Sequence, residues 1–238
     1  MPLGSLSNEQ GFALIAECTS TRNLLGYGSY VVRDAPFWDT TRDPVLTMLS
    51  IGMEKLHKLA LGLIVLDDEG SWPAKAAMKD WGHGIAAMHH RLLPELVRRA
   101  GDASPFVRAK VGAIASNVVV PPLIRVLDLY GRSGRFFYLD SLARSPQVFD
   151  PAHAWGDVEN AARDDPHVSN LMGNALERPA DQSAWDSLRS AQNERIASAI
   201  EVIWEAISSA SANGVLGEVG RMVASELAPT SVGRQRSS

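Results

Sequence analysis

Residues 43–66 read DPVLTMLSIGMEKLHKLALGLIVL and carry the clearest helical pattern in the chain. Their apolar residues recur in steps of three and four, which places them on one face of a helix. That face consists of Val45, Leu49, Met53, Leu56, Ala60 and Leu63. Asp43 is a good N-cap and Pro44 suits the first helical position, so the pattern predicts a helix from Asp43 to about Leu66. Because its apolar face must be buried, we expect this helix to lie at the centre of the fold.

A second helical pattern follows over residues 72–93, WPAKAAMKDWGHGIAAMHHRLL. Its connection to the first helix, residues 67–70, is short and acidic, and a connection of this length makes two helices antiparallel neighbours. Ser71 is expected to cap the second helix. Two close glycines, Gly82 and Gly84, cost on the order of 2 kcal/mol in a helix interior, so we predict a break and a fresh helix start there.

Caps and breaks elsewhere also predict helices. Ser7 and Gln10 have the form of a capping box, and the first helix is expected to end at about Leu25, where Gly26 and Gly28 follow. The next stretch, through Trp38, is expected to be a loop whose tryptophan folds back over the core or forms a lip for a partner. Further helix starts are predicted at Ser104, Asp150 and Asp181, with a break at Pro121 and Pro122.

The C-terminal part is expected to contain a long helix from Asp181 to about Ala210 and a short last helix over residues 216–227. Residues 229–238 lack any apolar period and are expected to be disordered. The sequence therefore predicts an all-α, multi-helix bundle with long antiparallel helices, in one domain over residues 1–228. More than about half of the chain should be helical, against roughly one third in an ordinary globular protein.

Composition narrows the classes of function. Of 238 residues, 45% are hydrophobic, which is enough for a core, and the formal net charge is −4. With no overall positive field, any RNA or nucleotide site must be a local patch. The single cysteine, Cys18, reads as a buried structural thiol and fits a reducing compartment such as the cytoplasm. No uninterrupted apolar run reaches the roughly 20 residues of a membrane span, so no membrane partner is expected.

The candidate chemistry lies on the two central helices. Glu54 precedes His57 by one helical turn, where a carboxylate favours the charged imidazole and orients its ring, as in a general base or a phosphate-binding group. The alternative is an ion pair on the helix surface. At the predicted break, His83 would lie at a helix N-terminus, which suits a phosphate. We expect Glu54, His57 and His83 to face the same space as catalytic candidates.

Arg132 and Arg135 lie among glycines and aromatic residues, which suits a phosphate clamp with stacking surfaces, so they are candidate substrate-binding residues. The alternative is that they neutralise a helix C-terminus while the neighbouring aromatic side chains, residues 136–138, pack in the core. Metal binding by His83, His89 and His90 is not expected, because adjacent histidines on a helix point in different directions. The sequence indicates no metal and no cofactor.

Residues 53–58, with Met53-Glu54-Lys55 and Lys58, and residues 82–88, with Gly82-His83-Gly84-Ile85 and Met88, resemble the helical HEPN superfamily over about residues 43–142. The resemblance implies a small α-bundle, usually dimeric, that binds or cleaves RNA or nucleotides, often in prokaryotic defence or toxin-antitoxin systems. It also implies that a nuclease of this kind works as a metal-independent ribonuclease. The family's nuclease spacing of an arginine before a histidine is absent here, which leaves binding or a structural role as alternatives.

Three functional hypotheses follow from these patterns. The first is a HEPN-like protein that acts on or binds RNA or nucleotides through the five candidate residues. The second is a non-catalytic helical interaction protein, a homodimer or a component of a larger assembly with a protein partner. The third is an enzyme for a small substrate. A homodimer is expected because Ile203 and Trp204 are adjacent on the last long helix, lie about 100° apart and cannot both face one narrow seam.

Overall fold

The computed structural model describes residues 3–34 and 38–233. Within these ranges the chain forms eleven α-helices and no strand, with 82% helix, which confirms the all-α class. Several predicted caps are confirmed by their hydrogen bonds. The side chain of Asp150 accepts from the Ala152 N–H, and that of Asp181 accepts from the Ser183 N–H. At the N-terminus, Ser7 and Gln10 form the predicted reciprocal capping box.

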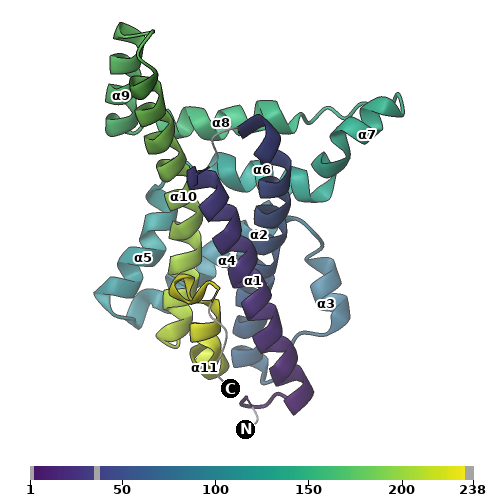
Figure 1. Ribbon diagram of the computed structural model, residues 1–238. Helices are drawn as coiled ribbons and strands as arrows, with labels where there is room; N and C mark the ends of the chain where they lie inside the picture. Colours follow the sequence, from purple (N-terminus) through teal and green to yellow (C-terminus); the bar gives the residue numbers. More distant parts are fainter. Residues whose placement is uncertain (1–2, 35–37, 234–238) are drawn as a thin grey trace.

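Three long helices form the centre of the molecule (Figure 1): α1 (Asn8–Asp34), α2 (Trp38–Glu69) and α10 (Gln182–Ala212). α1 packs along both α2 and α10. The apolar face predicted for residues 43–66 is confirmed, because none of its six residues is more than 1% exposed. α2 is thus a buried central element, on which α1 and several shorter helices pack.

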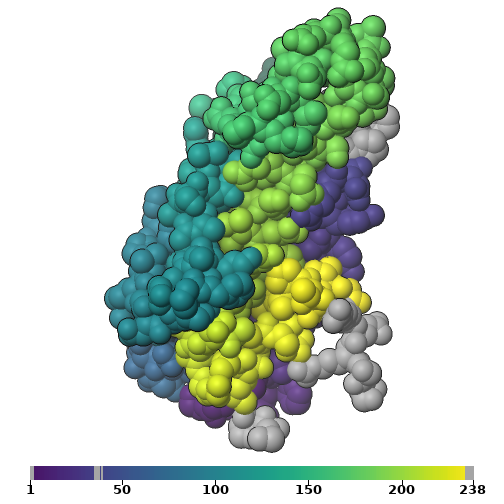
Figure 2. Space-filling view, turned by 90° about the vertical axis from the view of Figure 1, so that its left-hand side faces the viewer, coloured from purple at the N-terminus to yellow at the C-terminus, as the bar shows by residue number. Residues whose placement is uncertain are grey.

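Shorter helices surround this centre. They are α3 (Lys75–Asp80), α4 (Ile85–Arg99), α5 (Pro105–Ser116), α6 (Val120–Arg132), α7 (Phe137–Leu142), α8 (Pro151–Arg163), α9 (Pro166–Glu177) and α11 (Gly217–Leu227). α4 and α6 pack on α2, α5 packs on α10, and α11 packs against all three long helices. The α9 end, together with the start of α10, projects beyond the rest of the chain (Figure 2) and has a small apolar cluster of its own.

The predicted end of the first helix is wrong. α1 continues through Gly26 and Gly28 to Asp34. A Cβ atom at Gly26 would lie 2.6 Å from the Val232 side chain, and one at Gly28 would lie 2.6 Å from the Leu49 side chain. These glycines therefore permit close packing, of the C-terminal segment at Gly26 and of α2 at Gly28, and do not end the helix. Cys18, farther back on the same helix, is buried as predicted.

The predicted start of the second helix is also wrong. α2 begins at Trp38, so Pro44 lies inside the helix and Asp43 is not its cap. The Trp38 ring stacks on Trp155 of α8, with ring centroids 4.5 Å apart. This contact holds the turn that precedes Asp43 and places Trp38 against the core. Of the two predicted alternatives, a tryptophan folded over the core is the one observed. Residues 35–37 of the expected loop lie outside the described residues.

Between α2 and α4 the structure is partly as predicted. Ser71 does not cap a helix, because α3 begins only at Lys75 and has no side-chain cap. The break at the two glycines is confirmed: Gly82 has a φ of 59°, and α4 starts at Ile85. His83 therefore lies just before the first turn of α4.

α5 and α6 are separated at residues 117–119, where the two prolines predict a break, and Pro121 lies in the first turn of α6. The two helices meet at 72°. Within the described ranges, no helix alone has both the length and the apolar character to cross a membrane. This bent pair reaches both only when its two helices are taken together.

The C-terminal part of the chain covers the face of α10 that carries Trp204. Ile203 and Trp204 are both buried within the chain, and the Trp204 Nε1–H donates to the Leu227 carbonyl over 2.6 Å. The prediction that one of these two residues is left for a second copy of the chain is therefore wrong. The predicted disorder is wrong for residues 229–233, because Pro229–Ser231 forms a 3₁₀ turn and Val232 packs on the core. Residues 234–238 lie outside the described residues.

Candidate functional site

A hydrogen-bonded pair of histidines, one buried and one half-buried, joins α2 to α4. His57 is fully buried, and its Nδ1 lies 2.8 Å from the Met53 carbonyl oxygen one turn earlier. Its Nε2 lies 3.0 Å from Nδ1 of His89. The three groups form a line of hydrogen bonds from the helix backbone of α2 to the ring of His89.

The carbonyl at the start of this line determines where the protons lie. A carbonyl oxygen only accepts, so Nδ1 of His57 must carry the proton, and in the neutral ring Nε2 is then an acceptor. Nδ1 of His89 must therefore donate to it. When His89 is neutral, its Nε2 has no proton and is free to accept a hydrogen bond.

Burial keeps both rings neutral at neutral pH. Desolvation and, to a lesser degree, the neighbouring His89 lower the pKa of His57, the hydrogen bond to the Met53 carbonyl opposes them, and together these effects bring the pKa to about 3. Desolvation likewise lowers the pKa of His89 to about 4, with a contribution from His90. Both shifts follow from the cost of a charge in a dry environment. At pH 7 the two imidazole rings are therefore uncharged, and the hydrogen bond between them has a fixed direction.

His89 opens onto a cavity of about 590 Å³ between α4, α5 and α6, which we call the His89 cleft. Most of its walls are apolar, including Leu93, Pro121 and Ile124. The polar groups that line it are His89, His90, Arg125, Asp128 and Arg132. A largely apolar cavity with a few converging polar groups is the usual form of a small-molecule site.

Asp128 organises the wall of this cleft. Its side chain is nearly buried, and Oδ1 accepts from the Ala86 N–H over 3.2 Å. It thereby caps α4, whose own N-cap residue, Gly84, has no side chain to do so. The other oxygen, Oδ2, pairs with Arg132 Nη2. Half of the Arg132 side chain remains exposed, so its other N–H groups are available to a ligand.

The predicted catalytic residues fall into two separate contacts. Glu54 Oε1 lies 3.0 Å from Nδ1 of His83 and 2.7 Å from Nζ of Lys58. The hydrogen bonds of His57 go instead to Met53 and His89. Glu54 and His83 are thus brought together as expected, at the edge of the bundle. A surface ion pair between Glu54 and His57, the alternative, does not fit, because the His57 imidazole is fully buried.

The two predicted arginines also separate. Arg132 lines the His89 cleft, whereas Arg135 lies over the Phe136 ring, 4.9 Å from its centroid, and is not among the cleft residues. The alternative in which the aromatic side chains pack in the core is wrong for Phe136 and Tyr138, which are 45% and 58% exposed. Of the five predicted site residues, only Arg132 lines this cleft.

Comparison with family models, with curated proteins and with solved structures finds no match for this chain. In the described part of the chain, no cluster of three or more histidine, cysteine or acidic side chains is placed to hold a metal ion. The chemistry of the His89 cleft is therefore the basis for a functional proposal.

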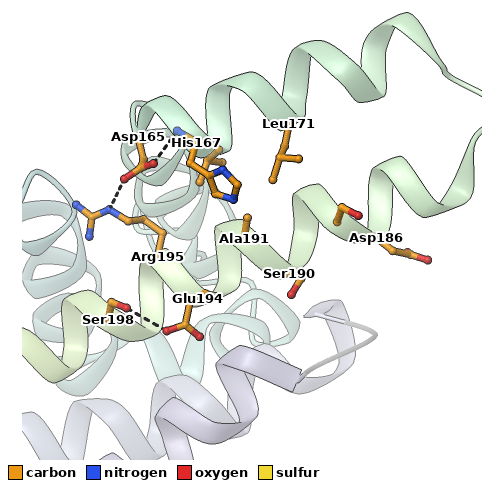
Figure 3. Close-up of a pocket in the computed structure, with 11 residues that line it drawn as sticks. Asp165, His167, Leu171, Asp186, Ser190, Ala191, Glu194, Arg195 and Ser198 are labelled. Atoms are coloured by element: carbon orange, nitrogen blue, oxygen red, sulfur yellow. Dashed lines mark hydrogen bonds and ion pairs between the residues drawn. The ribbon is translucent and has the colours of Figure 1, made fainter.

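A larger groove between α9 and α10 is a weaker candidate (Figure 3). Its volume is about 960 Å³, but it is open, and its charged groups already have partners within the chain. Asp165 Oδ2 lies 3.4 Å from Nε of Arg195, and Glu194 accepts from Arg33 over 2.8 Å. The hydrogen bonds from Arg33 lower the pKa of Glu194. These ion pairs explain the polar lining without a ligand.

Two residues of the cleft were missed by the sequence analysis. His89 was considered only as a metal ligand, and its partner, His57, lies 32 positions away, a separation that no short motif records. Asp128 gave a detectable signal, because it is a lone carboxylate between Leu127 and Leu129 in an apolar run. A charge in that position is costly to bury without a partner, which marks it as a residue with a specific role.

Proposed function

We propose that the His89 cleft binds a nucleotide-sized anionic ligand. The observation that carries the proposal is the neutral His89, which lines the same cavity as Arg132 and whose Nδ1 is engaged by His57, so that its unprotonated Nε2 is left to accept a hydrogen bond. A guanidinium binds phosphate through several N–H groups, and a neutral imidazole accepts from a hydroxyl or amino group of the same ligand. A nucleotide offers both kinds of group.

The size and charge of the cleft support a single nucleotide over an RNA strand. Its volume of about 590 Å³ lies within the usual range for small-molecule pockets. Two arginines line it: Arg132 pairs with Asp128, and Arg125 Nη1 lies 3.8 Å from Asp157. Both guanidinium groups are more than half exposed and have five N–H donors each, so both keep donors for an anion. Apolar walls at Pro121 and Ile124 suit the flat face of a base.

The low pKa of His89 supports binding over catalysis. A general base works best when its pKa lies near the working pH. With a pKa of about 4, His89 is neutral at pH 7 but only weakly basic. We therefore propose that His89 selects ligands by accepting a hydrogen bond. Of the activities that the HEPN resemblance implies, this proposal keeps nucleotide binding and leaves out RNA cleavage.

Calorimetric titration with AMP, GMP, ATP and inorganic phosphate tests the proposal. We expect saturable nucleotide binding to the wild-type protein and a loss of about tenfold or more in affinity for Arg132→Ala, because a charge-assisted hydrogen bond is removed. In His89→Asn, the amide can keep the donor to His57 but has no group in place of Nε2. That variant should lose affinity for nucleotides and keep its affinity for phosphate.

Matched controls come from outside the cleft. Arg135→Ala removes an exposed arginine, and His153→Asn removes an exposed histidine of α8; both should bind as the wild type does. No saturable binding of any tested nucleotide to the wild-type protein would contradict the proposal. Equal losses in Arg132→Ala and Arg135→Ala would also contradict it, since only Arg132 lines the cleft.

The homodimer stays a prediction, although its original reason is gone because Trp204 is covered by α11 within the chain. Small-angle or light scattering at micromolar concentration measures the mass directly. We expect twice the 25.7 kDa of one chain. A mass that stays at one chain across the concentration range would contradict the dimer.

A further inference from the structure

A second cavity, about 350 Å³ in volume, lies between α1, α2 and the segment that carries α3; we call it the α3 pocket. Its floor is apolar, with Leu14 of α1 and Leu59 of α2 both buried. Trp72 and Met78 line its outer side. It shares no lining residue with the His89 cleft.

One wall of the α3 pocket is held in place by a glycine. A Cβ atom at Gly62 of α2 would lie 2.5 Å from the Trp72 ring, closer than packed atoms approach. Glycine at this position therefore lets the indole lie directly on the helix. The Trp72 wall is fixed by close packing.

The rest of the outer side is formed by α3, an element with little other reason to pack here. α3 stands beside α2 at the edge of the bundle (Figure 1), and none of its residues is buried. Met78 is its one residue that is not exposed, and it lines the pocket. The flanking Gly70 and Gly82 both have positive φ, 72° and 59°, with open space around them. A flexible thioether side chain thus covers the apolar cavity and can adapt to an occupant.

Cationic groups lie at the edge of the pocket. Lys55 and Lys58 line it, against the single carboxylate Glu17. Lys55 Nζ lies 2.9 Å from Glu17, and Lys58 Nζ lies 2.7 Å from Glu54. Since an ammonium group carries three N–H donors, Lys58 keeps donors for an anion after this contact.

From this combination we infer that the α3 pocket binds an amphiphilic carboxylate, with an aliphatic or aromatic body between Leu59, Trp72 and Met78 and its anionic group at Lys58. The volume corresponds to about a dozen water molecules. Water against such walls finds few hydrogen-bond partners, so an apolar body displaces it favourably. The lysines then favour an anionic over a neutral or cationic head group.

The test uses octanoate, octan-1-ol and octylammonium, which share a chain and differ in charge. Methyl-¹³C methionine NMR of the full chain reports on Met78, whose signal is assigned from Met78→Leu. We expect saturable shifts of the Met78 methyl with octanoate and weaker binding of the other two compounds. Lys58→Gln should weaken octanoate binding about two- to fivefold, as expected for a partly exposed ion pair.

A filling variant tests the location. Ala13 lies exposed on the pocket rim, so Ala13→Trp should fill the cavity without disturbing the core and reduce octanoate affinity at least tenfold. Ala109→Trp, at an exposed position of α5, is the matched control and should bind normally. The inference is overturned if the wild type shows no saturable binding, if Ala13→Trp binds as well as Ala109→Trp, or if octan-1-ol binds as tightly as octanoate. Nucleotide binding at the His89 cleft is independent of each of these outcomes.

Discussion

Replacing His57 with alanine is expected to lower the free energy of unfolding by about 3 kcal/mol. The imidazole is fully buried, so its removal leaves a cavity among core side chains. It also removes the acceptor of the His89 Nδ1–H, which then lies partly buried without a partner. Cavity formation and an unsatisfied donor both destabilise the native state. Urea unfolding followed by circular dichroism measures the change.

His83→Ala is the matched control. The His83 side chain is 74% exposed and contacts Glu54 at the surface. Exposed substitutions of this kind usually change stability by less than about 0.5 kcal/mol. If His57→Ala and His83→Ala unfold at the same urea concentration, then the buried histidine pair does not stabilise the fold.

Acidification is the second large effect, with about 2 kcal/mol of stability lost at each buried histidine between pH 8 and pH 5. In the unfolded chain both rings regain the usual pKa of 6.5, whereas in the folded chain their pKa values are about 3 and about 4. Between these values the unfolded state binds protons that the native state does not. Stability is therefore complete above about pH 7 and falls as the pH drops towards 4.

Urea unfolding at a series of pH values checks both the sign and the size of this effect. The slope of the unfolding free energy against pH should be positive between pH 4.5 and 6, as the excess of protons on the unfolded state requires. His89→Asn removes one titrating group and should lower the slope by the amount that corresponds to about one bound proton. A wild-type slope near zero would show that the pair is not held neutral by burial.

The helices could be read from the sequence where local chemistry decides them. The apolar period of residues 43–66 and the caps at Asp150 and Asp181 depend on neighbours a few positions away, and they are confirmed. Gly26 and Gly28 misled the prediction because their role is set by distant side chains, those of Val232 and Leu49. The sequence alone does not distinguish a glycine that allows close packing of a distant segment from one that ends a helix.

The candidate site was only partly predictable for the same reason. Residues three apart on a helix differ by about 60° in direction, which was enough to separate Glu54, on the exposed edge, from His57, in the core. The helix that carries His89 does pack on α2, as the sequence predicted, but the predicted short connection at residues 67–70 is wrong: α2 runs to Glu69, and residues 70–84, which include α3, join α2 to α4. Which histidine would meet His57 was not predictable, because it depends on where α4 starts after the glycine break.

The cap that Asp128 provides for α4 links the order of folding to the shape of the cleft. In the described part of the chain, α1, α5, α8, α9 and α10 are each capped by a side chain within one turn, whereas the first turn of α4 is capped by a carboxylate 42 positions later. Closing a loop of that length costs conformational entropy before the hydrogen bond is gained. The start of α4 should therefore become ordered only after α6 has docked, so that His89 reaches its final position in the same late step that builds the wall carrying Arg132.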